Sequence, residues 1–304
     1  MICRAVCYRI SDKLIREGGK IILYFDLRTH DSAYDFLLDF LDITDKDFIT
    51  DYIVECNKDF ETFWKKHFER LETVDIADLR IIAFHITATQ DECAEIKESG
   101  LINLQKVLSK DTKFKELLAS YGITFDIPKR TVTAKDKVIN INYDNYRDKF
   151  RLSQYEQSIS AVAHRLYYDY LVNGFMSNDD VFNYGTEIHK RTEFFLQLVE
   201  LFPQLKEAEQ KWIEQSKSYK ITFFAHIEQI QPFCFELDNL RDSPFDDWSD
   251  LSIEQRLKKQ LLSYSIDRAF RWGRNETFLY IKNDIDIPSE QILSYEEIHE
   301  PILT

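Results

Sequence analysis

Glycine is scarce in this sequence, and no glycine stands in a nucleotide-binding pattern. Seven glycines are spread over 304 residues, and neither GxGxxG nor GxxxxGK occurs. These patterns mark doubly wound dinucleotide-binding folds and phosphate-binding loops, so both classes are disfavoured. The zinc-protease pattern HExxH is absent as well.

Cysteine is also scarce and irregularly placed. The five cysteines stand at positions 3, 7, 56, 93 and 234, and no CxxC pair occurs. Zinc sites and redox pairs normally need closer spacing. We therefore expect free thiols that fill core space, and no metal site.

Long apolar runs are missing. No run approaches the roughly 20 residues that a membrane-spanning helix requires. The N-terminal stretch MICRAVCYRISDKLIREGG is charged and broken, without the apolar region of a signal peptide. We expect a cytoplasmic protein with no membrane partner.

Positive charge is in the minority. The sequence contains 39 Lys and Arg residues and 53 Asp and Glu residues, so the net charge is −14. A nucleic-acid-coating protein is normally basic, because phosphate contacts supply most of its affinity. The acidity leaves open a local cleft that reads one exposed nucleotide, or an acidic face for a basic partner.

Hydrophobic residues are plentiful, and their periodicity predicts an α+β fold. They make up 44% of the chain, with 23 Phe and 16 Tyr, which is enough for a sizeable core. Strands are expected at residues 19–27, 80–87 and 218–230, with another opening residues 276–292. Helices are expected at residues 31–43, 59–71, 89–100, 101–122, 154–175 and 251–272.

Two stretches carry the residue types of a reactive site. In RIIAFHITAT, the expected strand contains His85 and Thr87, and the helix after it ends at Gly100-Leu101. In NETFLYIKNDIDIPSEQI, Glu276 opens an expected strand that leads to Ile-Pro.

FHITATQDECAEIKESGL and NETFLYIKNDIDIPSEQI, in this order, resemble segments of the ADP-ribosyltransferase superfamily of the His-Tyr-Glu, toxin-like type. The resemblance implies a split β-sheet core with helical insertions in residues 79–304. Residues 1–78 would then form a mostly helical N-terminal extension. It also implies NAD as substrate, with no metal.

The resemblance assigns roles to residues of both stretches. Glu276 would stabilise the positive charge that develops on the ribose as the nicotinamide bond breaks. His85 would bind the adenosine-side ribose, assisted by Thr87. Tyr184 would stack on the nicotinamide ring, and Tyr121 and Tyr143 are its rivals for this role.

The residues before Glu276 bear on the acceptor. Members that modify arginine often carry Glu or Gln two positions before the catalytic Glu, whereas Arg274 stands there in this chain. Arg271, Trp272 and Arg274 offer cations and an aromatic ring, which suit a nucleotide. RNA or DNA is therefore favoured over protein as acceptor, although cations at a helix end also satisfy the helix dipole.

Three further residues are candidates for acceptor binding: His189, Arg191 and Glu193. The first two would face a phosphate. Glu193 would face the same cleft or the N-terminus of a helix. By family analogy, the protein would act as a bacterial toxin or anti-phage effector that needs an antitoxin or inhibitor protein.

Other interpretations remain open. A non-enzymatic, acidic interaction protein would use His85 as a core histidine bonded to a carbonyl and Glu276 as a solvated charge. Arg80 and His85 have the Arg-x4-His spacing of helical, HEPN-like ribonucleases, although RIIAFHIT is typical of a strand. The Glu-x-Lys at residues 95–97 is found in metal-dependent nucleases, but on a helix a salt-bridged surface pair is expected.

Overall fold

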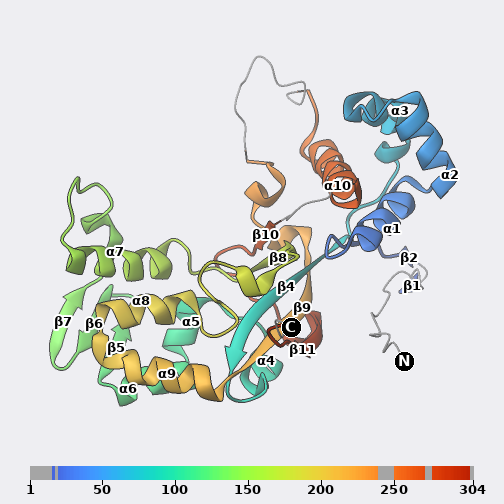
Figure 1. Cartoon of the computed structure of the whole chain (residues 1–304). Coiled ribbons are helices and arrows are strands. Elements are labelled where there is room, and N and C mark those ends of the chain that lie inside the picture. The colour runs from blue at the N-terminus through green and yellow to red at the C-terminus, as the bar shows by residue number, and fades with distance from the viewer. Residues whose placement is uncertain (1–15, 18–19, 239–249, 271–275, 302–304) are drawn as a thin grey trace, which may run out of the picture. The chain divides into compact units, whose positions relative to one another are not determined.

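The chain is a mixed α and β protein that divides into two compact units. The computed structural model describes residues 16–17, 20–238, 250–270 and 276–301 (Figure 1). Unit 1 holds the described residues up to Ala83, with Phe175–Asp179 and those of Phe224–Leu279. Unit 2 holds Phe84–Gly174, Asp180–Phe223 and the described residues from Tyr280 onward.

Helices dominate unit 1, whereas unit 2 combines helices with a small sheet. Unit 1 contains β1 (Arg16–Glu17), β2 (Lys20–Ile21), β3 (Tyr24–Phe25), α1 (His30–Leu41), α2 (Asp45–Phe48), a π-helix (Ile49–Glu55), α3 (Phe60–Glu72), two 3-10 helices (Ile227–Gln229, Pro232–Phe235) and α10 (Ile253–Phe270). Unit 2 contains α4 (Ala94–Ser99), α5 (Leu104–Ser109), α6 (Lys113–Ser120), β5 (Ile123–Asp126), β6 (Thr131–Ala134), β7 (Lys137–Asn140), α7 (Gln154–Tyr167), α8 (Glu193–Leu201), α9 (Lys206–Gln215), β11 (Ile292–Glu297) and 3-10 helices at Tyr143–Asn145, Val181–Asn183, Pro203–Leu205 and Ser289–Gln291. Four strands continue along the chain from one unit into the other: β4 (Arg80–Thr89), β8 (Asn173–Ser177), β9 (Lys217–His226) and β10 (Thr277–Tyr280).

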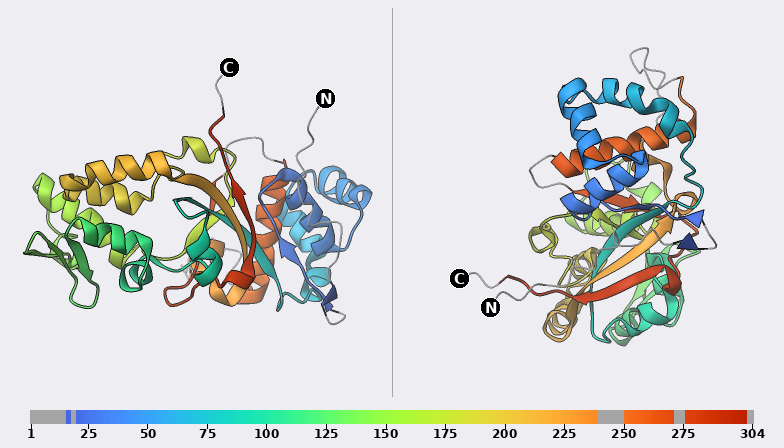
Figure 2. Two further views of the ribbon diagram at one scale, coloured as in Figure 1. Left: turned by 90° about the horizontal axis from the view of Figure 1, so that it is seen from below. Right: turned by 90° about the vertical axis from the view of Figure 1, so that its right-hand side faces the viewer.

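The core of unit 1 is formed by helices α1, α3 and α10. Helix α10 contacts both of the others, and it lies between them in the right panel of Figure 2. Helix α1 begins in a capping box, where Thr29 and Ser32 each bond the other's backbone N–H. The rings of Phe48 and Phe270 stack with centroids 5.5 Å apart. These aromatic contacts follow from the high Phe content, because large rings bury the most apolar area per residue.

The core of unit 2 lies between its helices and the β5–β6–β7 sheet. Helices α7 and α8 contact each other, and α8 and α9 lie side by side (Figures 1 and 2). Strands β5, β6 and β7 pair antiparallel in chain order. A Ser153–Glu156 capping box starts α7. Buried side chains from α7, α8 and the small sheet then form one cluster.

The larger sheet contains the strands that carry the predicted reactive residues. Its strands follow the order β10-β8-β4-β9-β11, and β3 pairs with β4 outside this path. The β3–β4 pair is parallel and the β9–β11 pair is antiparallel. Strand β8 is therefore the neighbour both of β4, which contains His85, and of β10, which follows Glu276.

Several predicted elements are confirmed, whereas β5, β6, β7, β8 and β11 were not predicted as strands. Strands β4 and β9 and helices α1, α3 and α10 match the expected segments closely. Residues 101–122, expected to form one helix or two short helices, form two short helices, α5 and α6. The expected helix at 154–175 ends at Tyr167, and Gly174 belongs to strand β8 instead. Strand β11 was not predicted either.

The described cysteines agree with the expectation of free thiols. Cys56, Cys93 and Cys234 are buried and form no disulfide, and burial raises the pKa of Cys93 to about 11. Cys3 and Cys7 lie outside the described residues. Within the described ranges, no helix combines the length and apolar character needed to cross a membrane.

Candidate functional site

His85 lies on strand β4 with its ring fixed by a neighbouring strand. Past Phe84 the strand alternates between buried and partly exposed residues, so His85 and Thr87 share the more open face. His85 Nδ1 lies 2.8 Å from the carbonyl oxygen of Asn173, at the start of β8. A carbonyl oxygen only accepts, so Nδ1 carries the proton and donates.

This bond leaves His85 Nε2 as a hydrogen-bond acceptor. Burial lowers the pKa of the His85 imidazole from its ordinary value of 6.5, and the bond to Asn173 opposes part of that shift. The neutral ring then carries its lone pair on Nε2. No hydrogen-bond partner for Nε2 is found among the described residues. His85 Nδ1 is therefore bonded to a carbonyl oxygen, which is the contact expected for an interaction protein that uses His85 as a core histidine. His85 Nε2 can still accept a hydrogen bond from a hydroxyl group.

Glu276 is an exposed carboxylate at the start of β10, in unit 1. The side-chain amide of Asn178, just after β8, donates to Glu276 Oε1 over 3.4 Å, which is a long and weak hydrogen bond. The neighbouring residues Ser177 and Thr277 are joined by a 3.1 Å bond between their hydroxyl oxygens. Glu276 is thus oriented at one oxygen, and Oε2 has no partner in the described part of the chain.

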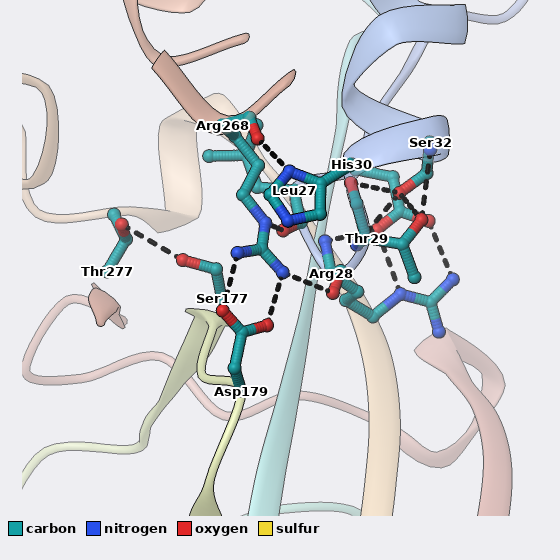
Figure 3. A network of polar contacts seen from close by, with 10 residues as sticks. Leu27, Arg28, Thr29, His30, Ser32, Ser177, Asp179, Arg268 and Thr277 are labelled. Carbon is teal, nitrogen blue, oxygen red and sulfur yellow. Dashed lines mark hydrogen bonds and ion pairs between the residues drawn. The ribbon is translucent and has the colours of Figure 1, made fainter. Parts of the chain in front are cut away.

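A buried arginine holds the end of β8 in place. Arg268 of α10 is 2% exposed, and its two terminal nitrogens lie 2.8 and 2.6 Å from the two carboxylate oxygens of Asp179 (Figure 3). The same guanidinium donates to the carbonyl oxygens of Leu27 and Arg28, each over 2.9 Å. A cation paired in this way, with four hydrogen bonds, is tolerated in a protein interior, whereas an unpaired one is not. It ties α10, the β3–α1 connection and the residues that follow Ser177 into one support.

A second set of polar contacts extends this support to the start of α1. His30 Nδ1 lies 2.6 Å from the carbonyl oxygen of Arg268, and Arg28 donates to both carboxylate oxygens of Asp26 over 2.9 and 2.7 Å. Asp26 is 6% exposed, so this carboxylate is held by its cation rather than by water. The two ion pairs and the histidine form one polar network in Figure 3.

The predicted acceptor-binding residues of unit 2 are engaged in contacts with the protein itself. His189 is 2% exposed, and its Nε2 lies 2.8 Å from Glu300. Arg191 donates to Glu209 over 2.5 Å and to the carbonyl of Thr186 over 2.8 Å. These contacts give a structural reason for both residues, and they lend no support to acceptor binding.

Glu193 has a similar position at the first turn of α8. Its two carboxylate oxygens accept from Arg165 over 2.6 Å and from the Thr186 hydroxyl over 2.7 Å. A carboxylate at a helix N-terminus is favoured by the helix dipole, so the contacts of Glu193 need no ligand to explain them.

The predicted nicotinamide-stacking tyrosine stays a prediction. Tyr184 is half-buried in the turn after the 3-10 helix Val181–Asn183. Its rivals Tyr121 and Tyr143 pack against the hydrophobic core of unit 2. Thr87 is half-buried, on the same strand face as His85. Arg271, Trp272 and Arg274 lie outside the described residues.

The two stretches that carry the family resemblance meet in unit 2. Leu101 and Ile287 exchange two backbone hydrogen bonds, Leu101 N to Ile287 O at 2.8 Å and Ile287 N to Leu101 O at 3.0 Å. Lys106 adds an ion pair of 2.8 Å with Asp286. The Gly-Leu that ends the first stretch is therefore bonded to the Ile-Pro that ends the second.

The ribonuclease alternative fails on geometry. Arg80 and His85 lie on strand β4 and not on a helix. Residues five apart on a strand point to opposite faces, so these two cannot converge on one phosphate. The Arg80 guanidinium lies over the rings of Tyr24 and Phe224 instead.

The Glu-x-Lys at 95–97 is not a salt-bridged pair. On α4, Glu95 accepts from the Lys113 backbone N–H over 2.8 Å and Lys97 donates to the carbonyl of Glu92 over 2.8 Å. Residues two apart on a helix do not face each other, which explains why the expected pair does not form. Among the described residues, no three His, Cys, Asp or Glu side chains gather to hold a metal ion.

Sequence analysis missed the supporting residues altogether. Asn173, Asn178 and Asp179 lie on or beside β8, which resembled the end of a helix. Arg268 lies in helix α10, and an arginine in a helix normally faces solvent. The cluster of Asn and Asp in NGFMSNDD was the one local signal for a chain turn.

Comparison of the chain with protein-family models, with curated proteins and with solved structures gave no match.

Proposed function

We propose that this chain is an NAD-dependent ADP-ribosyltransferase that modifies a macromolecule, with an ADP-ribosyltransferase-like core in residues 79–304. Two hydrogen bonds support this assignment, one within each unit, and both are made by residues on or beside β8. Asn173 bonds the His85 ring at the start of the strand, and Asn178 bonds the Glu276 carboxylate just past its end. The residues that the family resemblance singles out are thus each oriented by one of these hydrogen bonds.

His85 suits the recognition of a ribose. Its Nδ1 proton is committed to Asn173, so its Nε2 lone pair accepts from a hydroxyl group. The lowered pKa keeps the ring neutral near pH 7, which preserves the acceptor. A ribose hydroxyl of NAD is the donor that we assign to it, with the Thr87 hydroxyl beside it on the same strand face.

Glu276 suits the reacting end of the dinucleotide. In the reaction the C1′–N bond to nicotinamide breaks, and nicotinamide leaves with the bonding electron pair. The positive charge that develops on the ribose is stabilised by the carboxylate. An acceptor heteroatom then bonds C1′ and loses its proton to solvent. The exposed position of Glu276, with one oxygen held by Asn178, fits this role.

The remaining parts of the assignment rest on the family resemblance alone. These are the cytoplasmic location, action as a bacterial toxin or anti-phage effector, and an antitoxin or inhibitor protein as partner. The acceptor that we favour is RNA or DNA.

Labelled NAD tests the proposal directly. We expect the protein, incubated with labelled NAD and cell extract, to release nicotinamide and to label a macromolecule that nuclease or protease digestion then identifies. Glu276→Gln should lower transfer at least about a hundredfold, because the charge that stabilises the ribose is lost. Glu98→Gln, at another exposed carboxylate, is the matched control and should leave transfer unchanged.

Two results would contradict the assignment. One is the absence of nicotinamide release with every extract, which would leave the acidic interaction protein as the better interpretation. The other is an unchanged rate in Glu276→Gln, which would move the catalytic role to another residue. Thermal melting of both variants establishes that the fold is intact.

A further inference from the structure

Positive charge is concentrated in one part of this acidic chain. Residues 127–168 contain eight Lys and Arg against four Asp and Glu, a net charge of +4, whereas the whole chain carries −14. This segment, called here the basic segment, comprises β6, β7, the connection that follows and α7, all in unit 2 (Figure 1).

The fold holds several of these cations out in solvent. Lys135 and Asp136 form the two-residue connection between β6 and β7, with φ of 48° and 66°. Positive φ at both positions is the geometry of a tight hairpin turn. Lys135 and Lys137 therefore stand at a projecting hairpin end, and both are exposed. Antiparallel pairing with β5 and β7 keeps β6, and so this end, in a defined register.

Three of the cations lack an acidic partner. Lys135, Lys137 and Arg151 have no Asp or Glu within ion-pair distance among the described residues, although most other Lys and Arg of the basic segment do. Lys137 lies over the Tyr155 ring at 5.6 Å, and Arg151 lies over the Phe150 ring at 5.9 Å. These positive charges are not neutralised within the protein.

Exposed aromatic rings alternate with the cations. Phe150 is 96% exposed, Tyr155 46% and Tyr168 47%, values that are unusual for large rings in a folded protein. The Tyr168 ring is stacked on the His164 ring with centroids 5.9 Å apart and planes 8° apart. Tyr143 contacts both rings edge-on. Tyr168, His164 and Tyr143 thus form one ring cluster, and burial in the core does not explain the exposure of Phe150, Tyr155 and Tyr168.

We propose that the basic segment is a docking surface for single-stranded nucleic acid. Unpaired cations attract the phosphate backbone, and exposed rings stack on bases that no complementary strand covers. A duplex hides its base faces, and an acidic peptide would use the cations but not the rings. This inference deepens the proposed function by narrowing the RNA or DNA acceptor to a single strand, and it relies on that function only for the transfer step.

Fluorescence anisotropy with the full-length protein tests the surface without NAD. The probes are labelled 12-nucleotide RNA and DNA single strands and the matching duplex, at 50 mM salt. We expect the single strands to bind more tightly than the duplex. Lys137→Glu/Arg151→Glu should weaken single-strand binding about tenfold or more, because two phosphate contacts become repulsive. Phe150→Ala should weaken it about fivefold, the loss expected for one stacked base.

A matched double charge reversal separates this surface from net charge. Lys65→Glu/Lys110→Glu changes the total charge equally at exposed lysines outside the basic segment, and it should alter binding less than twofold. Equal losses in the two double variants, equal affinity for the duplex, or no single-strand binding by the wild type would each overturn the proposal. Binding that persists without any transfer from NAD would refute the proposed function and leave the docking surface standing.

Discussion

Replacement of Gly100 by alanine should be severely destabilising, and the reason lies in its neighbours. Gly100 ends α4 with φ of 75° and ψ of −166°, a region that is essentially restricted to glycine. A Cβ built there would collide with the carbonyl oxygen of Ile287 and come within 2.9 Å of Pro288 Cα. Both obstacles are backbone atoms, which cannot rotate away as a side chain can.

The expected loss can be estimated from two parts. Backbone strain in this region costs about 1–3 kcal/mol. Relief of the collision requires Ile287 to move away, which breaks its two backbone hydrogen bonds with Leu101 at roughly 1 kcal/mol each. Gly100→Ala should therefore lower the free energy of unfolding by about 3–5 kcal/mol.

Two other glycines provide controls for the separate parts. Gly122 has φ of 72° but no heavy atom within 4 Å of its added Cβ, so Gly122→Ala reports strain alone, about 1 kcal/mol. Gly185→Ala meets nothing within 4 Å and should be nearly neutral. Urea unfolding followed by circular dichroism measures all three. A Gly100→Ala loss no larger than that of Gly122→Ala would refute the close approach to Ile287.

Three further outcomes follow from the structure. Arg268→Met should lower the free energy of unfolding by about 3 kcal/mol in urea, because it leaves Asp179 and two carbonyl oxygens without their donor; a loss below about 1 kcal/mol would contradict the role assigned to this ion pair. Ser153→Ala should lower it by about 1 kcal/mol in the same assay, because the α7 capping box is lost. The pKa of His85 is lowered by folding, so its contribution to stability is full above its unfolded value of 6.5 and is lost as pH falls below that value. The urea midpoint of His85→Gln should therefore depend less on pH between about 7 and 5 than that of the wild type. Burial also lowers the pKa of His67, but this histidine is present in both proteins and contributes equally to both profiles. Parallel pH profiles would contradict the shift of the His85 pKa.

Sequence patterns predicted those elements whose burial is regular along the chain. Strand β4 is rich in β-branched and aromatic residues, and α3 has apolar residues at helical spacing, so local periodicity was enough for both. Strand β8 was not predicted from its sequence pattern, because it is short and contains Gly174, which resembled the glycine that ends a helix. A Cβ at Gly174 would lie 2.8 Å from the carbonyl oxygen of Phe84. Glycine stands there to let two strands approach, a cause that appears only in the folded chain.

The residues of the candidate site also divide into those that the sequence predicted and those that it did not. His85 and Glu276 were predicted because a polar residue in or beside an apolar strand is unusual and draws attention. Arg268 was not, because its partner Asp179 lies 89 residues away and a helix arginine normally faces solvent. His189 and Arg191 show the opposite situation. Their positive charge suggested that they bind a phosphate, yet His189 contacts Glu300 and Arg191 contacts Glu209. No local sequence pattern identifies such distant partners.

The separation of charge makes the proposed nucleic-acid acceptor compatible with an acidic protein. Screening limits each charge to about 8 Å at physiological ionic strength. A phosphate at Lys137 or Arg151 therefore responds to the local excess of cations and hardly to the acidic remainder of the chain. The same acidic remainder would repel nucleic acid elsewhere on the surface, so the proposed binding would be confined to the basic segment, where exposed rings such as Phe150 can stack only on unpaired bases. Net charge accordingly disfavours a coating protein, and it is compatible with the proposed local contact with a single strand.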